Sequence, residues 1–319
     1  MKDSAAAVTE TLDAFLQRGR ALVDEALDRY LPKAPACPAI VSDAMRYSVF
    51  AGGKRLRPVL TLAAADAVGR ADARPEPVEG LALPAACAIE MIHTYSLIHD
   101  DLPAMDDDTL RRGRPTLHVV YGEGIAILAG DGLHAEAFTL LAREPATDDP
   151  AIVARKLRVA RAIGEAAGAA GMVGGQAIDL QAAGQAPGHV LMLDAGGLKA
   201  MHARKTGALI RASAVSGAIM AGAAEPRVAA IDRYATDLGL GFQIVDDILD
   251  VEGTPEQLGK TAGKDAAGAK PTYPALFGLD RSRVLARECI DRAQQTLADA
   301  GLTRGQLGAI AQWVASRKN

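Results

Sequence analysis

The sequence predicts an all-α protein, and three observations support this fold class. Apolar residues recur at spacings of three and four along most of the 319 residues, whereas strand-like alternation is scarce. Aromatic residues make up only 4% of an alanine-rich chain, which favours helices packed over small side chains rather than a sandwich or barrel. Short clusters of proline, glycine and charged residues separate the apolar stretches, as loops between helices do.

Five such breaks, taken in chain order, separate the expected helices. They lie at residues 31–38, 69–77, 143–150, 182–189 and 222–227. The stretch around Met172 is rich in glycine and alanine, so neighbouring helices could approach it closely, or it could leave room for a ligand. No break is long enough, or low enough in complexity, to be an interdomain linker. We therefore expect a single domain over residues 1–319.

Composition narrows the class of protein further. The formal net charge of −4 gives no general electrostatic attraction to nucleic acid, so no nucleic-acid partner is expected. The N-terminal stretch is amphipathic and acidic, unlike a signal or transit peptide, and no apolar run reaches the ~18 residues expected of a membrane span. Cys37, Cys87 and Cys289 are far apart and form no CxxC pair, which favours a reducing compartment. The sequence thus predicts a cytoplasmic protein without membrane insertion.

Two apolar helical stretches, YSLIHDDLPAMD and GFQIVDDILD, each end in paired aspartates followed by a further aspartate. Their acidic residues are Asp100, Asp101 and Asp106 in the first stretch and Asp246, Asp247 and Asp250 in the second. Pro103 is expected to end or bend the first helix, whereas Asp246 and Asp250 are four residues apart and share one helix face. One such cluster would be explained by a solvated turn. Two of them favour a pair of metal-binding carboxylate groups.

The residue types favour Mg²⁺ and a phosphorylated ligand. Mg²⁺ prefers oxygen ligands, takes one or two carboxylates and completes its shell with water and substrate phosphates. Basic residues in GGKRLRP, LRRGRPT, ARKTGALI and LGKTAGKD suit a diphosphate, although each alone could be a solvated surface cation. We find no Walker A spacing, no GxSxG and no cysteine beside a general base. The combination indicates C–O cleavage in which metal ions and cations stabilise a diphosphate leaving group.

A metal phosphohydrolase is a weaker reading. It is suggested by the pair His99–Asp100, but the other five histidines show no pattern of further metal ligands.

Eight motifs occur in a fixed order between about residues 46 and 279. They are GGKRLRP, DDLPAMD, LRRGRPT, AGDGL, GGQAIDL, KTGALI, GFQIVDDILD and LGKTAGKD. In this combination the sequence resembles the trans-prenyltransferases of the polyprenyl synthetase family, and within that family the bacterial farnesyl diphosphate synthases. The resemblance implies an isoprenoid-synthase helical bundle around a deep central cavity, usually as a homodimer.

The resemblance also implies a reaction. Dimethylallyl or geranyl diphosphate ionises to an allylic cation in the presence of about three Mg²⁺ ions. The double bond of isopentenyl diphosphate attacks that cation, and loss of a proton gives a chain five carbons longer. The implied product is (2E,6E)-farnesyl diphosphate.

Carried over position by position, the resemblance implies roles for the residues of these motifs. The direct magnesium ligands are Asp100, Asp106 and Asp246, and the residues expected to act through water are Asp101, Asp247 and Asp250. The allylic diphosphate is gripped by Arg111, Lys205 and Lys260, and the groups near the ionising carbon are Thr206 and Gln243. The isopentenyl diphosphate site comprises Lys54, Arg57, His93 and Arg112, and the segment that closes over the site carries Lys270.

Product length depends on the helix before Asp100. A helix rises ~1.5 Å per residue, so Tyr95 lies ~7.5 Å further along it, followed by Ser96. The resemblance implies that a bulky aromatic here is the floor that stops the growing chain, although an ordinary core tyrosine shows the same periodicity. If Tyr95 turns aside, the product becomes the C20 geranylgeranyl diphosphate.

Two further alternatives make different demands on the motifs. A non-catalytic partner subunit would have lost one aspartate motif, whereas both are intact here. A terpene cyclase would replace DDILD with an Asn/Ser/Glu pattern. The basic C-terminal sequence QWVASRKN receives no role.

Overall fold

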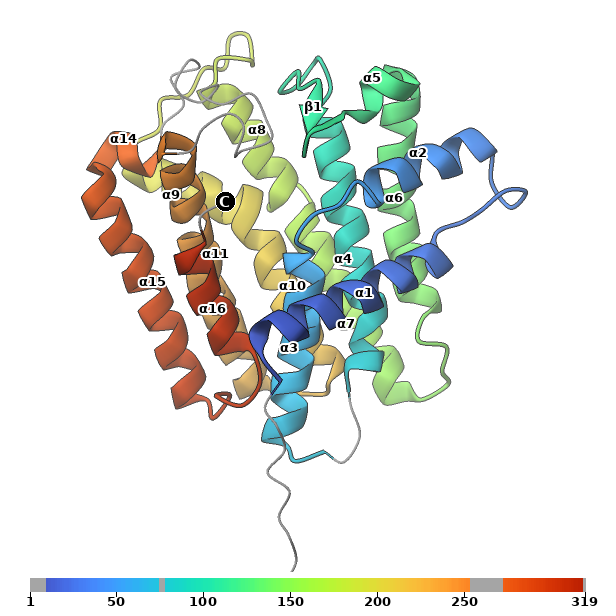
Figure 1. Cartoon of the computed structure of the whole chain (residues 1–319), viewed down its shortest axis with the longest axis vertical. Helices are drawn as coiled ribbons and strands as arrows, with labels where there is room; N and C mark the ends of the chain where they lie inside the picture. The colour runs from blue at the N-terminus through green and yellow to red at the C-terminus, as the bar shows by residue number, and fades with distance from the viewer. Residues whose placement is uncertain (1–9, 75–77, 253–271, 318–319) are drawn as a thin grey trace, which may run out of the picture.

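The computed structural model describes residues 10–74, 78–252 and 272–317, and in these ranges it is a helical bundle (Figure 1). The helices are α1 (Leu12–Tyr30), α2 (Ala39–Val49), α3 (Leu56–Ala71), α4 (Glu79–Asp100), α5 (Leu117–Tyr121), α6 (Glu123–Arg143), α7 (Pro150–Ala167), α8 (Met172–Ala182), α9 (Ala195–His202), the π-helix η1 (Ala203–Gly207), α10 (Ala208–Met220), α11 (Glu225–Glu252), α14 (Tyr273–Phe277), α15 (Leu279–Asp299) and α16 (Leu307–Ser316). Among the described residues, strand structure is limited to a short antiparallel hairpin of β1 (Leu110–Arg111) and β2 (Arg114–Pro115). The predicted all-α class is confirmed.

The helix ends follow local sequence signals. All five predicted breaks fall where one helix gives way to the next. Asp149 caps α7 by accepting a 2.8 Å hydrogen bond from the Ala151 N–H, and Pro150 stands at the first helical position, where its missing N–H costs nothing. The helix α4 ends at Asp100, three residues before Pro103, as predicted from the proline.

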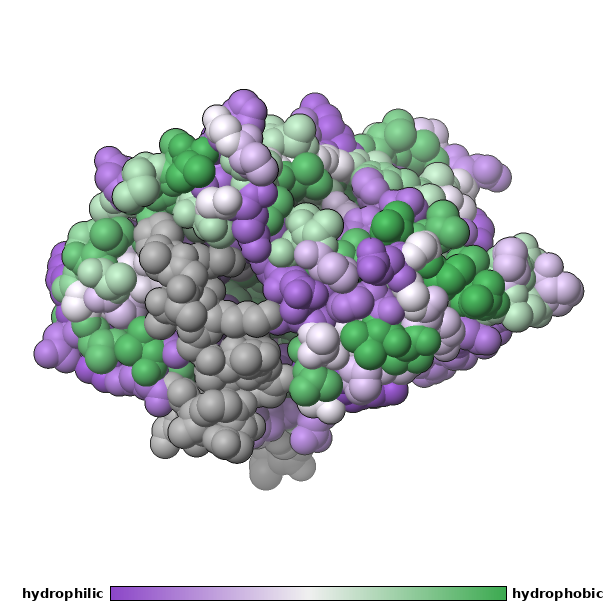
Figure 2. Space-filling view, turned by 90° about the horizontal axis from the view of Figure 1, so that it is seen from above, coloured by the Kyte–Doolittle hydropathy of each residue, from purple (hydrophilic) through white to green (hydrophobic). Residues whose placement is uncertain are grey.

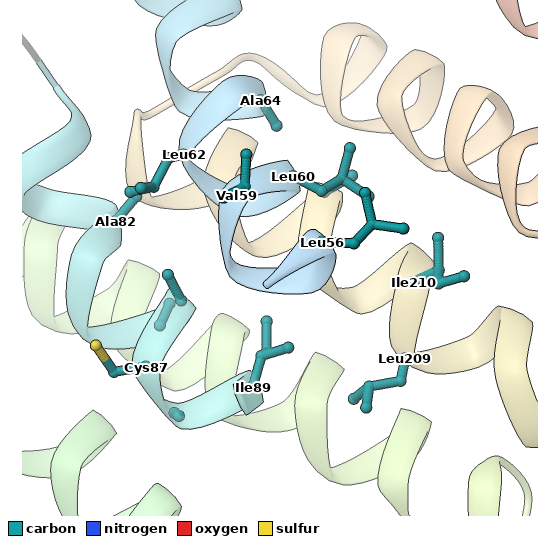
Figure 3. Close-up of a cluster of buried hydrophobic side chains, with 14 of the residues drawn as sticks. Leu56, Val59, Leu60, Leu62, Ala64, Ala82, Cys87, Ile89, Leu209 and Ile210 are labelled. Atoms are coloured by element: carbon teal, nitrogen blue, oxygen red, sulfur yellow. The ribbon is translucent and has the colours of Figure 1, made fainter. Parts of the chain in front are cut away.

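The core is built around α3, α4 and α10. The helix α3 is buried on almost every side, and its Leu60 and Leu62 lie with Ile89 of α4 and Ile210 of α10 in one apolar cluster (Figure 3). A Cβ on Gly217 of α10 would come within 2.0 Å of the Thr61 carbonyl oxygen, so this glycine lets α10 and α3 pack backbone against backbone. Small residues thus bring the central helices close together, as the alanine-rich composition indicates.

The helices α4 and α6 correct the expectation that no apolar run is long enough to span a membrane. By length and composition alone, α4 and α6 are each apolar enough to cross a membrane. Within α4, 78% of the apolar window is buried inside the bundle, whereas in α6 the share is 39%. The helix α4 is therefore a core helix, and α6 leaves apolar side chains such as Ile127 and Leu128 exposed.

Candidate active site

A cavity of about 890 Å³ lies among the C-terminal halves of α4 and α11, the segment before α3, and α8, η1 and α16. Its lining is unusually rich in charge, with carboxylates from α4's following loop and from α11 facing basic residues of several elements. Figure 2 looks onto the end of the bundle that carries β1 and α5, where hydrophilic residues border a hollow. The fold therefore brings the two acidic motifs to one cavity.

The first acidic motif is held by the turn that follows α4. The Asp106 N–H donates to the Asp100 carbonyl oxygen at 2.8 Å, which folds the chain back over the helix end. Arg111 donates from Nε and Nη2 to the Asp101 carboxylate, at 2.7 Å and 2.5 Å to Oδ1. Burial raises the pKa of Asp100 to about 6, with Lys205 opposing and Asp106 adding to the rise. Desolvation is thus the main reason that the ionised form of Asp100 is disfavoured.

The second acidic motif lies on one side of α11. Asp246, Asp247 and Asp250 all line the cavity. Asp247 is buried and accepts 2.9 Å hydrogen bonds from the Tyr273 N–H and the Gln243 side-chain amide. Burial raises the pKa of Asp247 to about 7, because these two donors offset only part of the cost of desolvation. The backbone donor fixes Asp247 as an anchor for the start of α14, so its structural role is established by geometry.

The donor set of the two motifs fits Mg²⁺. Asp106 and Asp246, from the two motifs, line the same cavity, and Asp100 interacts electrostatically with both Asp106 and Lys205. The three aspartates offer carboxylate oxygens, which are the ligands that hard cations such as Mg²⁺ prefer. Burial raises the pKa of Asp100, and a divalent cation bound beside it would offset the cost of burying its ionised form. Within the described ranges, no three Asp, Glu, His or Cys side chains form a ready-made metal cage.

Lys205 is positioned by a local irregularity of the helix. It lies in η1, and π-helical turns of this kind are frequently found at functional sites. Its Nζ donates to Asp179 Oδ2 at 2.5 Å. Burial lowers the pKa of Lys205, but Asp179 and Asp100 raise it more, so the ammonium stays charged in the cavity wall. A Cβ on Gly175 would meet the Lys205 backbone nitrogen at 2.3 Å, so the glycine-rich α8 is what permits this approach.

Thr206 and Gln243 form one hydrogen-bonded chain with Asp247. The Thr206 hydroxyl donates to Gln243 Oε1 at 2.9 Å, and Gln243 Nε2 donates to Asp247 Oδ1 at 2.9 Å. With its proton committed to Gln243, the Thr206 oxygen keeps its lone pairs for the cavity. Asp247, which carries no direct role in the sequence-based assignment of ligands, thus orients both groups.

A second group of cations lines the cavity around the start of α3. Lys54, Arg57 and Arg112 belong to it, and His93 lines the same cavity. His93 Nε2 lies 3.2 Å from Arg57 Nη1. Burial, followed by the charge of Arg57, holds the pKa of His93 well below its ordinary value, so the neutral imidazole accepts a hydrogen bond from the guanidinium. Arg112 donates to the Gly52 carbonyl oxygen, which ties the loop before α3 to the β-hairpin.

A buried ion pair that the sequence did not indicate supports this second group. Arg55, with a φ of 51°, turns inward and donates to Glu90 Oε1 at 2.7 Å, to Asp24 Oδ1 at 2.8 Å and to the Val49 carbonyl oxygen at 2.6 Å. The Arg55 and Glu90 side chains are 2% and 4% exposed. Because Arg55 points into the core, its neighbour Lys54 is left facing the cavity. In the sequence, only the close spacing of the basic residues in GGKRLRP could have indicated that one of them points into the core and another faces the cavity.

The C-terminal segment also reaches the cavity, a contribution that the sequence did not reveal. Trp313 of α16 and Arg317 after it line the wall. Arg317 Nη2 donates to Asp246 Oδ1 at 2.6 Å, and Lys54 Nζ lies 5.5 Å from the centre of the Trp313 ring. The basic sequence QWVASRKN therefore closes one side of the site.

The predicted chain-length residues, Tyr95 and Ser96, lie on α4. Tyr95 is buried, and its ring stacks on His134 of α6 with centroids 4.7 Å apart and meets His99 edge-on at 5.6 Å. On this helix the cavity described above is lined by Glu90, His93 and Leu97, and Tyr95 lies outside its lining. Ser96 donates to the His93 carbonyl oxygen of its own helix at 2.9 Å. The floor role of these two residues stays a prediction.

Two predicted substrate residues, Lys260 and Lys270, lie outside the described residues. Of the remaining predicted contacts, the structure brings together Lys54, Arg57, His93, Asp106, Arg111, Arg112, Lys205, Thr206, Gln243 and Asp246 in the wall of one cavity.

The helical bundle gathers two carboxylate motifs and two groups of cations around one cavity, and these are the side-chain types that metal ions and diphosphate groups require. The family model for polyprenyl synthetase matches residues 38–301. The chain belongs to the polyprenyl synthetase family, whose members are prenyltransferases.

Similar proteins carry names with different product lengths. The chain is 43% identical to a farnesyl diphosphate synthase of Geobacillus stearothermophilus, over 96% of this chain and 98% of that protein. It is 40% identical to a geranylgeranyl diphosphate synthase of Cyanophora paradoxa, over 96% of each. The crystal structure of an FPP/GFPP synthase from Zymomonas mobilis matches with a TM-score of 0.80 and 34% identity, over 95% of this chain and 98% of that one. The fold is thus that of isoprenyl diphosphate synthases, as the sequence predicted.

Proposed function

We propose that this protein is a Mg²⁺-dependent farnesyl diphosphate synthase, which condenses isopentenyl diphosphate with dimethylallyl or geranyl diphosphate. The observation that carries the proposal is the pairing of two carboxylate motifs with two separate groups of cations around one cavity. Two cation groups suit two diphosphates, one for each substrate. A partner subunit without activity would not need the complete set, and a terpene cyclase would not need the second group.

In this assignment Arg111 and Lys205 hold the allylic diphosphate beside Asp100, Asp106 and Asp246. Mg²⁺ bound by these aspartates would neutralise the diphosphate as its C–O bond breaks and the electron pair leaves with oxygen. Asp101 and Asp179 already orient Arg111 and Lys205 before substrate binds, so little rearrangement is required of those side chains.

The remaining residues stabilise the allylic cation or hold the second substrate. The Thr206 oxygen, oriented through Gln243, faces the developing allylic cation. Lys54, Arg57, neutral His93 and Arg112 hold the diphosphate of isopentenyl diphosphate, whose double bond attacks the cation. The tertiary cation that forms then loses a proton from the adjacent carbon to the released diphosphate, which restores a double bond.

The C15 product is supported by the contacts of Tyr95. Its ring is fixed between His134 and His99, and this stacking opposes the turning aside that a C20 product would require. The names of the similar proteins include both product lengths, so product length is part of the proposal.

Tyr95→Ala should lengthen the product from C15 to C20 or beyond, because it removes the bulk that ends the chain. Tyr95→Phe, which keeps the ring and its stacking on His134, should still release C15. Chromatography of the dephosphorylated products of each variant measures this directly. A C15 product from the alanine variant would place the floor elsewhere.

We further propose that the protein is a homodimer through the exposed face of α2, α5 and α6. These helices contact one another and expose the large apolar residues Ile40, Val119, Val120, Ile127 and Leu128. A clustered apolar surface of this kind usually marks an interface. Burying it against a second copy in the cytoplasm, rather than in a membrane, accounts for the apolar character of α6.

Leu128→Glu should shift the protein from dimer to monomer, because it places a charge in the centre of the proposed interface. Leu276→Glu is the matched control: this leucine is 42% exposed on α14, compared with 55% for Leu128. Analytical ultracentrifugation at micromolar concentration gives the masses. A monomeric wild type, or a dimeric Leu128→Glu variant, would contradict this interface.

The catalytic proposal is tested by incubating the purified protein with Mg²⁺, labelled isopentenyl diphosphate and an allylic diphosphate. Incorporation of label into a longer chain, abolished by a chelator, is the expected result. Cleavage of the allylic substrate alone would instead favour a cyclase or hydrolase.

A further inference from the structure

Arg317, the first residue after α16, is a buried cation that pairs with a predicted metal ligand. Its Nη2 donates to Asp246 Oδ1 at 2.6 Å and to the Phe242 carbonyl oxygen at 2.8 Å. The guanidinium lies over the Phe242 ring, 3.7 Å from its centre, and the side chain is only 6% exposed. Within the described ranges, the buried Nε finds no hydrogen-bond partner. The group is held firmly, yet its hydrogen bonding is incomplete.

The same segment lies beside the second group of cations. Trp313, one turn earlier, is in cation–π contact with Lys54. Burial lowers the pKa of Lys54, and the nearby charge of Arg317 lowers it further, while Asp246 opposes the shift. Two cations therefore share the field of one carboxylate, so that the position of Arg317 affects both Asp246 and Lys54.

A divalent cation and Arg317 make conflicting demands on Asp246. The oxygen that accepts the guanidinium bond is one of the two that a metal ion could use. A metal ion bound there would also lie close to the positive charge of Arg317, whose side chain is 6% exposed, and the two like charges would repel each other. The carboxylate has a second oxygen, so the two cations compete through charge repulsion rather than for a single acceptor atom.

We propose that Arg317 is an exchangeable counter-ion of Asp246, which it neutralises in the metal-free protein and releases when a divalent cation binds with diphosphate. The inference rests on the proposed function for the metal role of Asp246. In this proposal the guanidinium of Arg317 balances the negative charge of Asp246 until a divalent cation binds. It also makes metal binding and the position of α16 interdependent, since each is linked to the same carboxylate.

The test measures metal binding without turnover. Isothermal titration calorimetry with inorganic diphosphate at saturating concentration gives the Mg²⁺ concentration for half-maximal binding. Arg317→Gln should lower that concentration about fivefold or more, the ordinary scale of coupling between linked sites, and Arg317→Lys should lie between it and the wild type. Arg211→Gln, which breaks an exposed pair with Asp232, is the control and should leave the value unchanged.

Diphosphate affinity is measured separately at saturating Mg²⁺, because Arg317 could also attract the anion. An unchanged or higher Mg²⁺ requirement in Arg317→Gln would overturn the proposal. So would weaker diphosphate affinity with no change in the Mg²⁺ requirement, since Arg317 would then be only an anion ligand.

Trp313 provides a second readout, because it is the single tryptophan of the chain. In the wild type, Mg²⁺ with diphosphate should change its emission as Arg317 leaves Asp246, and metal-free Arg317→Gln should already show that change. Identical emission in all states would contradict the exchange. Incorporation of isopentenyl diphosphate by the wild type distinguishes failure of the proposed function from failure of the Arg317 exchange. If the wild type is active but Arg317→Gln has an unaltered Mg²⁺ requirement, only the exchange is contradicted.

Discussion

Asp100→Asn and Asp246→Asn should each reduce the rate of isopentenyl diphosphate incorporation by ~10³-fold or more, equivalent to about 4 kcal/mol of transition-state stabilisation. Each change removes a carboxylate oxygen proposed to hold Mg²⁺ against the leaving diphosphate. Radiolabel incorporation at saturating substrates and Mg²⁺ measures the loss. Asp107→Asn is the matched control, because Asp107 is exposed in the same acidic run and is not one of the proposed metal ligands.

The Asp100 variant should lose activity without losing its fold. In the metal-free protein the pKa of Asp100 is raised to about 6, above its ordinary value, so its ionisation opposes folding as the pH rises through this range. Replacing it with neutral asparagine should leave stability at pH 8 equal to or above that of the wild type, measured by urea unfolding with a chelator present. Near-normal turnover in either variant, or activity lost equally in Asp107→Asn, would refute the metal assignment.

Glu90→Ala should lower the free energy of unfolding by about 3–5 kcal/mol, the usual cost of leaving a buried charge without its partner. Arg55, whose side chain is 2% exposed, would keep only the partly exposed Asp24 as an ionic partner among its contacts described above. Urea unfolding in metal-free buffer provides the measurement. The loss should also loosen the loop that orients Lys54.

Two further variants separate charge burial from general damage to the core. Asp232→Ala breaks the exposed pair with Arg211 and should cost no more than about 1 kcal/mol. The double variant Arg55→Met/Glu90→Leu removes both charges and should recover much of the lost stability. If the double variant is no more stable than Glu90→Ala, the buried charge is not the cause.

Much of the fold was predictable because helix boundaries are local. Prolines at positions 103 and 150 end or begin helices through their own backbone geometry, and all five breaks fall between helices. The π-helical turn at Lys205 was not predictable, because it depends on how η1 packs against α8 at Gly175. The apolar surface of α6 was also missed, since periodicity alone does not separate a core face from an exposed one.

The residues of the candidate site that belong to sequence motifs were predictable. The residues that orient them through tertiary contacts were not. Aspartate pairs and basic loops are visible in the sequence, and the structure places most of them around one cavity. The partners that orient them, such as Asp179 for Lys205 and Glu90 for Arg55, come from distant helices. Arg317 reaches Asp246 across 71 residues, a distance at which no local pattern could have paired them.

Product analysis of the wild-type protein is the most direct test of the proposed farnesyl diphosphate synthase activity. The protein is incubated with Mg²⁺, labelled isopentenyl diphosphate and geranyl diphosphate, and the dephosphorylated products are separated by chain length. A dominant C15 alcohol whose formation depends on Mg²⁺ is the expected result. A dominant C20 alcohol would contradict the Tyr95 floor while preserving the chemistry, and no incorporation of isopentenyl diphosphate would contradict the proposed function itself.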